Sequence, residues 1–349
     1  MRRTLEWLQD AQTPGRHAAW AGVTCVLVLA WLGLEQLSAQ LWFLPAGLRL
    51  AMLWIVPTRR WGWLGLAEIS AQAIKSLVLG YAIFTDTFLA VCVAPWLVYA
   101  GVILLLRGPR PAPGFEGPTR MLAFLLSGLL AAAGVSPLLW MYLVTFPMST
   151  ADTLASMFSF LYGDLTGQLV VAPLLLAILY SPPRPWPRTG MVRDVGLALL
   201  CALGVFLLLQ AYGELATHVL LVAFAPLFML GFRHGWAGAA VGTSLLGAVL
   251  QGLVMVGALV VDVTMLQLVL AIVGGGALVL GAASTALRRS HAELAERHAE
   301  LQAKNAELAG LADELRLVTQ RLVRIEEQGQ RELAGELDYE LGQAIHSLG

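Results

Sequence analysis

Apolar runs of about twenty residues constrain this chain more than any other feature. A helix needs roughly 20 apolar residues to cross the hydrocarbon core of a bilayer. Hydrophobic residues make up 58% of the chain and charged residues 13%, whereas a soluble domain has about 25% charged residues. We therefore predict an all-α fold, a polytopic membrane helix bundle. Long spans are expected at 19–39, 61–82, 87–106, 121–146, 157–180, 192–211, 235–258 and 264–287, and shorter ones at 41–56 and 218–232.

The arginines of the connections indicate how the bundle lies in the membrane. Lys and Arg accumulate in cytoplasmic loops. If all ten segments cross and the N-terminus is inside, the outer connections contain no Lys or Arg. We therefore favour ten crossings with both termini in the cytoplasm; a model of eight, with the short segments re-entrant or interfacial, leaves both termini on that side too. The inner connections carry Arg59, Arg60, Arg107, Arg110, Arg120, Arg184, Arg188, Arg193, Arg233, Arg288 and Arg289.

Ionisable residues within the spans form the first candidate site. A charge at bilayer depth costs about 2.5–3.5 kcal/mol on insertion scales and is normally turned toward the bundle interior. Glu68 and Lys75 are seven residues apart, too far for a direct bond along one helix, so each needs a partner from another helix. Arg49 can pair with Glu68 or with Asp164. Two interpretations stay open: structural ion pairs that fix helix packing, or a polar pocket for a ligand or partner, made of Arg49, Glu68, Lys75 and Asp164.

Short motifs in the membrane half occur in a recognisable order. They are Leu44–Pro45–Ala46–Gly47, Gly163–Asp164–Leu165–Thr166–Gly167, Ala172–Pro173 and Phe232–Arg233–His234–Gly235. With these motifs, residues 19–287 resemble the first type of membrane-associated sensor domain. The resemblance implies an integral membrane input module of the kind fused to histidine kinases or cyclic-dinucleotide enzymes. It does not identify the stimulus.

A heptad pattern replaces the apolar runs from Ser290 onward. Leucine recurs at every seventh position from Leu294 to Leu322, while Arg297 and Lys304 weaken the second seam position in the first half. Apolar residues at both seam positions are typical of a coiled coil, and we expect a parallel homodimer. The alternative is a solvated amphipathic helix that packs on its own bundle. The expected dimer seam is Leu308, Leu311, Leu315, Val318, Leu322 and Ile325.

The segment 333–343 reads Leu-Ala-Gly-Glu-Leu-Asp-Tyr-Glu-Leu-Gly-Gln. It resembles the phosphoacceptor helix of bacterial sensor histidine kinases, in the class that includes the hexose-phosphate uptake sensor. The resemblance implies that the family's phosphoaccepting histidine would stand at Asp338 and a second acid at Tyr339. A carboxylate cannot replace that imidazole in the same mechanism. The chain ends at Gly349 without room for an ATP-binding domain, so we expect no autophosphorylation; it is either a fragment of a longer kinase or a natural degenerate one.

These observations predict four segments. Residues 1–18 form a cytoplasmic N-terminal segment, 19–287 the membrane sensor domain, 288–328 a coiled-coil signalling helix, and 329–349 a remnant or start of a dimerisation and phosphoacceptor helix. The predicted function is a sensory and signal-transduction module of histidine-kinase type in the bacterial inner membrane. The alternative is a small-molecule transporter or channel.

The expected partners follow from this function. They are the lipid bilayer, a second copy of the chain, a membrane-protein or small-molecule stimulus, and a partner kinase or response regulator. The net charge of −1 gives no case for nucleic acid. Cys25, Cys92 and Cys201 lack the spacing of metal ligands or disulfides, and we expect no metal and no cofactor.

Overall fold

The computed structural model describes residues 17–39, 41–83, 85–108, 115, 117–143, 150–180, 189–211, 224–257 and 262–347. Residues 1–16 of the expected N-terminal segment, and the positions of Arg110, Arg184 and Arg188 in the predicted inner connections, lie outside the described residues.

The described residues are helical, which confirms the all-α prediction, and they contain no β-structure beyond an isolated bridge between Ala39 and Trp42. A π-helix at Leu89–Val93 precedes α6, after a three-residue helix α5 (Asp86–Phe88). The longer helices are α2 (His17–Gln36), α3 (Leu44–Ile55), α4 (Trp61–Val78), α6 (Ala94–Arg107), α7 (Pro118–Leu143), α8 (Thr150–Tyr180), α9 (Thr189–Ala211), α11 (Ala225–Met255) and α12 (Val263–Ser347).

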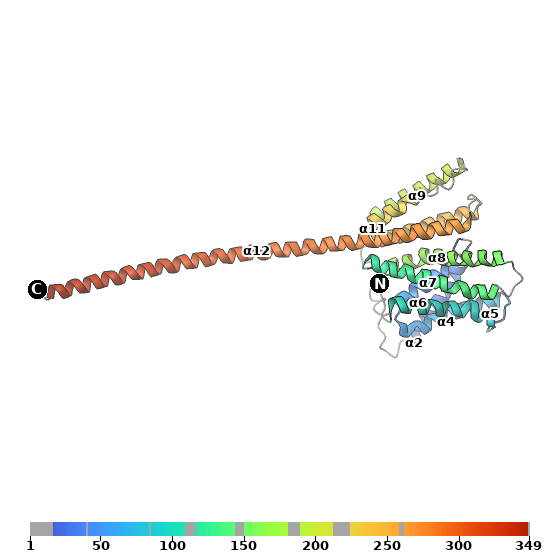
Figure 1. Ribbon diagram of the computed structural model, residues 1–349, viewed down its shortest axis with the longest axis horizontal. Coiled ribbons are helices and arrows are strands. Elements are labelled where there is room, and N and C mark those ends of the chain that lie inside the picture. The colour runs from blue at the N-terminus through green and yellow to red at the C-terminus, as the bar shows by residue number, and fades with distance from the viewer. Residues whose placement is uncertain are drawn as a thin grey trace. The chain divides into compact units, whose positions relative to one another are not determined.

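The chain divides into two compact units, Met1–Leu287 and Arg288–Gly349. Within the first unit, α8 packs against α3, α7 and α11, while α6 packs on α7, α2 on α4, and α9 on α11 (Figure 1). The second unit consists of the rest of α12, whose residues are almost all exposed up to Gln343. One helix therefore contributes residues to both units.

Six helices among the described residues are long and apolar enough to cross a membrane, which differs from the ten crossings predicted and from the alternative of eight. The 12-residue α3 spans only about 18 Å at 1.5 Å per residue and cannot cross a core of roughly 30 Å. In α4, Glu68, Gln72 and Lys75 reduce the apolar character. The six are His17–Gln36, Leu89–Arg107, Pro118–Leu138, Thr153–Tyr180, Ala225–Met255 and the helix that begins at Val263.

The predicted spans 218–232 and 235–258 meet at a kink rather than at a loop. The described part of the first belongs to α11, and Gly235 interrupts this helix with φ 74° and ψ −163°. A positive φ is accessible to glycine at little cost because glycine has no Cβ. The Arg-His-Gly sequence therefore bends one helix instead of separating two spans.

Helix α3 lies entirely within the bundle, with all twelve residues buried. Its contact with α8 uses two glycines: a Cβ on Gly47 would collide with the carbonyl oxygen of Gly167, and a Cβ on Gly167 would collide with the carbonyl oxygen of Phe43. Small residues allow membrane helices to approach this closely. The Pro-Ala-Gly and Gly-Asp-x-x-Gly motifs are thus the two sides of one helix contact.

The segment that precedes α3 is tied to three other helices. The backbone N–H of Phe43 donates to the carbonyl oxygen of Gly163 (2.9 Å), and Gln267 Nε2 of α12 donates to the carbonyl oxygen of Leu41 (3.1 Å). The backbone N–H of Leu41 donates to Gln251 Oε1 of α11 (3.1 Å). These bonds fix where α3 begins.

The other end of α3 is capped by one guanidinium. Arg107 is the last residue of α6, and its guanidinium carbon lies 5.2 Å from the centroid of the Trp61 ring. Basic side chains at a helix C-terminus satisfy its free carbonyls and interact favourably with the helix dipole. Arg107 Nη1 donates to the carbonyl oxygens of Leu53 (2.9 Å), Trp54 and Val56 (3.1 Å).

Gly167→Ala tests the close approach of α3 and α8. The added methyl group must displace the backbone at Phe43, and overpacking of this kind costs about 1–3 kcal/mol. We expect a lower thermal unfolding midpoint for the purified protein in detergent, followed by tryptophan fluorescence. Gly33→Ala in α2 is the matched control, because no heavy atom lies within 4 Å of its added Cβ, and it should unfold no earlier than the wild type. Equal midpoints for the two variants would contradict the contact.

Candidate functional site

Arg49 and Glu68 form a buried ion pair between α3 and α4. Arg49 Nε lies 2.8 Å from Glu68 Oε1 and 3.0 Å from Oε2, and Nη2 also bonds Oε1. Both side chains are buried. A two-nitrogen contact of this kind satisfies both carboxylate oxygens and fixes the orientation of the planar guanidinium. Of the two partners predicted for Arg49, the structure pairs it with Glu68.

Tyr99 continues this polar cluster toward α8. The Arg49 guanidinium carbon lies 4.6 Å from the centroid of the Tyr99 ring, a cation–π contact. The Tyr99 hydroxyl donates to Asp164 Oδ2 and accepts from Gln168 Nε2. Asp164 is 0% exposed and Tyr99 is equally buried. Four helices thus contribute to one polar cluster, which consists of Glu68, Arg49, Tyr99, Asp164 and Gln168.

Two oxygens of the polar cluster have no hydrogen-bond partner among the described residues. They are Asp164 Oδ1 and Gln168 Oε1. Buried polar atoms are nearly always hydrogen-bonded, and each exception calls for a physical explanation. Gly128 of α7 makes room for this amide, because a Cβ there would collide with Gln168 Oε1.

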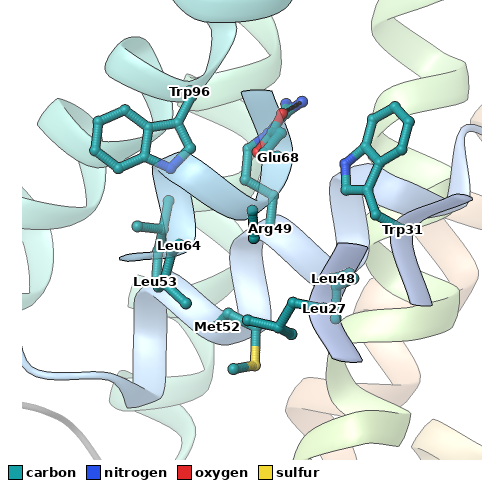
Figure 2. A pocket seen from close by; sticks show the side chains of 10 residues that line it. Leu27, Trp31, Leu48, Arg49, Met52, Leu53, Leu64, Glu68 and Trp96 are labelled. Carbon is teal, nitrogen blue, oxygen red and sulfur yellow. Dashed lines mark hydrogen bonds and ion pairs between the residues drawn. The ribbon is translucent and has the colours of Figure 1, made fainter. Parts of the chain in front are cut away.

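A small apolar cavity of about 30 Å³ lies beside the ion pair. Figure 2 shows Trp31 and Trp96 on either side of Arg49 and Glu68, with Leu27 and Met52 closing another side. A cavity needs roughly 10–15 Å³ to hold a water molecule, so this one accommodates about two. The Trp31 Nε1 donor is buried without a partner among the described residues, and it suits such a water.

Lys75 has a different partner from the rest of the predicted pocket. Its ammonium group pairs with Glu35 of α2, and the Lys75 side chain is 42% exposed. The structure therefore brings Arg49, Glu68 and Asp164 into one polar cluster through Tyr99, while Lys75 forms a second pair closer to the surface.

A third ionic group joins α9 to the kink of α11. Asp194 is buried, with Oδ2 2.9 Å from Arg233 Nη1 and 2.8 Å from His234 Nε2. The next residue, Gly235, lies against α12: a Cβ there would collide with the Thr285 hydroxyl. The Ser284 hydroxyl donates to the Phe232 carbonyl oxygen (2.8 Å). The Arg-His-Gly sequence therefore contacts α9 on one side and α12 on the other.

The predicted dimer seam and the degenerate phosphoacceptor position both lie on the exposed part of α12. Asp338 and Tyr339 are exposed, as are all six seam residues, whose exposed fractions range from 49% for Leu311 to 68% for Leu315. No three His, Cys, Asp or Glu side chains among the described residues are grouped closely enough to hold a metal ion.

Sequence reasoning missed Tyr99, Gln168 and Asp194. Tyr99 is a single polar tip in an apolar run, and Asp194 adjoins Arg193 at the start of a span, where charged residues are common. The one available signal is the spacing of Asp164 and Gln168, which are four residues apart and so share a helix face.

The bundle and its buried ionic groups define a multi-pass helical membrane protein. A comparison with protein-family models finds that the family described as MASE1 matches residues 16–288, most of the chain. The chain therefore belongs to the MASE1 family of membrane-associated sensor domains. No curated protein and no solved structure matches it.

Arg49→Gln tests whether the buried pair stabilises the fold. Removing one partner of a buried pair costs about 3–5 kcal/mol because the other charge remains unpaired. We expect a lower unfolding midpoint in detergent, and a smaller loss in the double variant Arg49→Gln/Glu68→Gln, which leaves no unpaired Glu68 charge.

Lys75→Gln is the control for this experiment. Its pair with Glu35 is partly exposed, and pairs of that kind contribute at most about 1 kcal/mol. If Arg49→Gln/Glu68→Gln lost as much stability as Arg49→Gln and Glu68→Gln lose separately and added together, Arg49 and Glu68 would not interact energetically.

Proposed function

We propose that this protein is a sensory signal-transduction module of histidine-kinase type, which passes a stimulus from its membrane bundle to a dimeric cytoplasmic helix. Membership of the MASE1 family over residues 16–288 is the observation that carries this proposal. The change of the same helix α12 from a packed segment to an exposed heptad segment supports it. Placement in the bacterial inner membrane with both termini in the cytoplasm belongs to the same proposal.

The input of the module is the polar cluster around Arg49. Ion pairs inside a bundle hold helices in one arrangement, because a charge that loses its partner at bilayer depth is costly. A ligand or membrane partner that changes these pairs therefore shifts α3 and α4 between two arrangements. Such a shift requires different contacts in each arrangement.

The step from bundle to output uses the contact between α11 and α12. Asp194 holds Arg233 and His234, and the adjacent kink at Gly235 rests on Gly281 and Thr285 of α12. A displacement of the kink is thereby transmitted to α12 through backbone atoms, which cannot adjust as side chains do. Arg288 and Arg289 follow within one turn.

The output is a parallel pair of α12 helices. The six seam residues are exposed in a single chain, and burying an apolar side chain contributes roughly 1.5–3 kcal/mol. Their seven-residue spacing favours another copy of the same helix, because the seams of two parallel copies are in register. The seam is strongest from Leu308 onward, where both seam positions are apolar.

Asp338 makes the module silent in phosphotransfer. A histidine kinase transfers phosphate to an imidazole nitrogen, and the carboxylate at this position lacks that nucleophile. Signal transfer in this chain is therefore mechanical, and a partner kinase or response regulator acts on the signal.

Cysteine cross-linking tests the parallel seam. In a background with Cys25, Cys92 and Cys201 changed to Ala, Leu315→Cys should form a disulfide-linked dimer in native membranes. Two parallel copies place this position against itself. The measurement is the fraction of dimer on a non-reducing gel after mild oxidation.

Gln320→Cys is the matched control, because residue 320 is five positions after Leu315 and lies on the opposite face of the helix. It should give little dimer. Equal cross-linking at both positions, or none at Leu315→Cys, would contradict the seam.

A phosphorylation assay tests the silent output. Purified protein in lipid nanodiscs with ATP labelled at the γ-phosphate should incorporate no label, since position 338 has no imidazole. Incorporation that Asp338→Asn abolishes would overturn this part of the proposal. The alternative function is transport. It would be supported by uptake of a solute into proteoliposomes that is lost in Arg49→Ala.

A further inference from the structure

The polar cluster in the bundle has an uneven number of charges. Glu68 and Asp164 are carboxylates, and the cation of the cluster is Arg49, which bonds Glu68 and lies over the Tyr99 ring. Two of the three Arg49 guanidinium nitrogens, Nε and Nη2, donate to Glu68. With every group in its usual ionisation state, two negative charges and one positive charge leave the buried cluster with a net charge of −1. A buried, uncompensated charge is avoided in proteins, which shift its protonation instead.

The hydrogen bonds place the excess charge on Asp164. Both oxygens of Glu68 accept from Arg49 Nε (2.8 Å and 3.0 Å), whereas Asp164 receives one bond, from the Tyr99 hydroxyl to Oδ2. Its Oδ1 has no donor among the described residues. An ionised carboxylate is stabilised by several hydrogen-bond donors, and the Asp164 carboxylate has fewer donors than that of Glu68.

The position of Gln168 supplies what a protonated Asp164 requires. The two residues are one turn apart on α8 and bind the same Tyr99 hydroxyl. Gln168 Oε1 is a buried acceptor without a donor among the described residues. A proton on Asp164 Oδ1 creates a hydrogen-bond donor. The unsatisfied acceptor Gln168 Oε1 lies on the same helix face and can accept from it, either directly or through a water molecule.

The other helices packed on α8 do not supply a compensating cation to this face. In α11 the charged residues are Arg233 and His234, and both bind Asp194. In α7 the charged residue is Arg120, in its first turn. Arg49 of α3 and Tyr99 of α6 are already counted, as is Glu68 behind Arg49. Lys75 pairs with Glu35.

We propose that Asp164 is a proton-binding site: an O–H bond forms at Oδ1 as hydronium from the solvent gives up its proton and leaves as water, and the excess charge of the Glu68–Arg49–Asp164 set is neutralised. No other bond changes in this step. A proton fits better than a metal ion, because the polar cluster offers only two unpartnered oxygens among the described residues, and the Arg49 guanidinium belongs to the same cluster. Release of the proton leaves an unpaired carboxylate beside α3 and α6.

This inference deepens the proposed function, because it names a proton as what the polar cluster binds. Its sensory consequence rests on that function, but the protonation does not. Infrared spectroscopy detects the carbonyl stretch of a protonated carboxylic acid, which shifts in D₂O. In nanodiscs at mildly acidic pH, the wild type should show one such buried band that is lost in Asp164→Asn.

Glu68→Gln provides a sharper test. This variant makes the cluster neutral with Asp164 ionised, so the Asp164 band should be lost or strongly reduced at the same mildly acidic pH although Asp164 itself is unchanged. Asp313→Asn, at an exposed position of α12, should leave the band as in the wild type. Asparagine is isosteric with a protonated aspartate, so Asp164→Asn should fold, and an unchanged unfolding midpoint would verify this.

Several results would overturn the proposal. They are the absence of the band in the wild type, its persistence in Asp164→Asn, and its full intensity in Glu68→Gln. Loss of the band on adding NaCl at constant pH would assign the site to Na⁺ instead. The sensory role is measured separately: the Leu315→Cys cross-linking should vary with pH in the wild type and not in Asp164→Asn. If the band behaves as expected and the cross-linking is independent of pH, the proton site stands and its sensory role fails; absence of the Leu315→Cys dimer at every pH would instead contradict the proposed dimeric output.

Discussion

The guanidinium of Arg49 is the charge around which the first unit is organised. It lies on a helix that has no exposed residue, so it must be neutralised by residues from other helices. Glu68 provides the carboxylate from α4, and Tyr99 provides a ring face from α6. Burying a charge is tolerated only when it is paired and hydrogen-bonded. Helices α3, α4 and α6 are thereby required to meet at one level of the bundle.

The ends of α3 show how the bundle holds this charge in place. At its start, backbone groups of Leu41 and Phe43 are bonded by α8, α11 and α12, and at its end Arg107 binds three carbonyl oxygens. Orphan backbone groups at helix ends need partners of this kind when no water reaches them. The segment that leads into the helix carrying Arg49 is therefore bonded to α12, whose later residues form the proposed output.

The sequence was sufficient to predict the helical membrane class and that Glu68 and Lys75 need partners from other helices. Apolar runs and the cost of a membrane charge are local properties, and both predictions rest on them. It could not identify Glu68 rather than Asp164 as the partner of Arg49, because that depends on how α3 and α4 pack. The predicted count of ten exceeds the six candidate spans among the described residues, in part because hydropathy does not distinguish a short helix buried in protein, such as α3, from one in lipid. Likewise the kink at Gly235 resembled a boundary between two spans.

The contact between Gly47 and Gly167 limits how this chain can vary. At most helix contacts in a bundle the residues can change in pairs, because a larger side chain on one helix is offset by a smaller one on its neighbour. Here each glycine faces a carbonyl oxygen of the other helix, and neither has a side chain left to lose. A substitution at one position cannot be rescued by a substitution at the other, so this chain must keep both glycines or the two helices must separate.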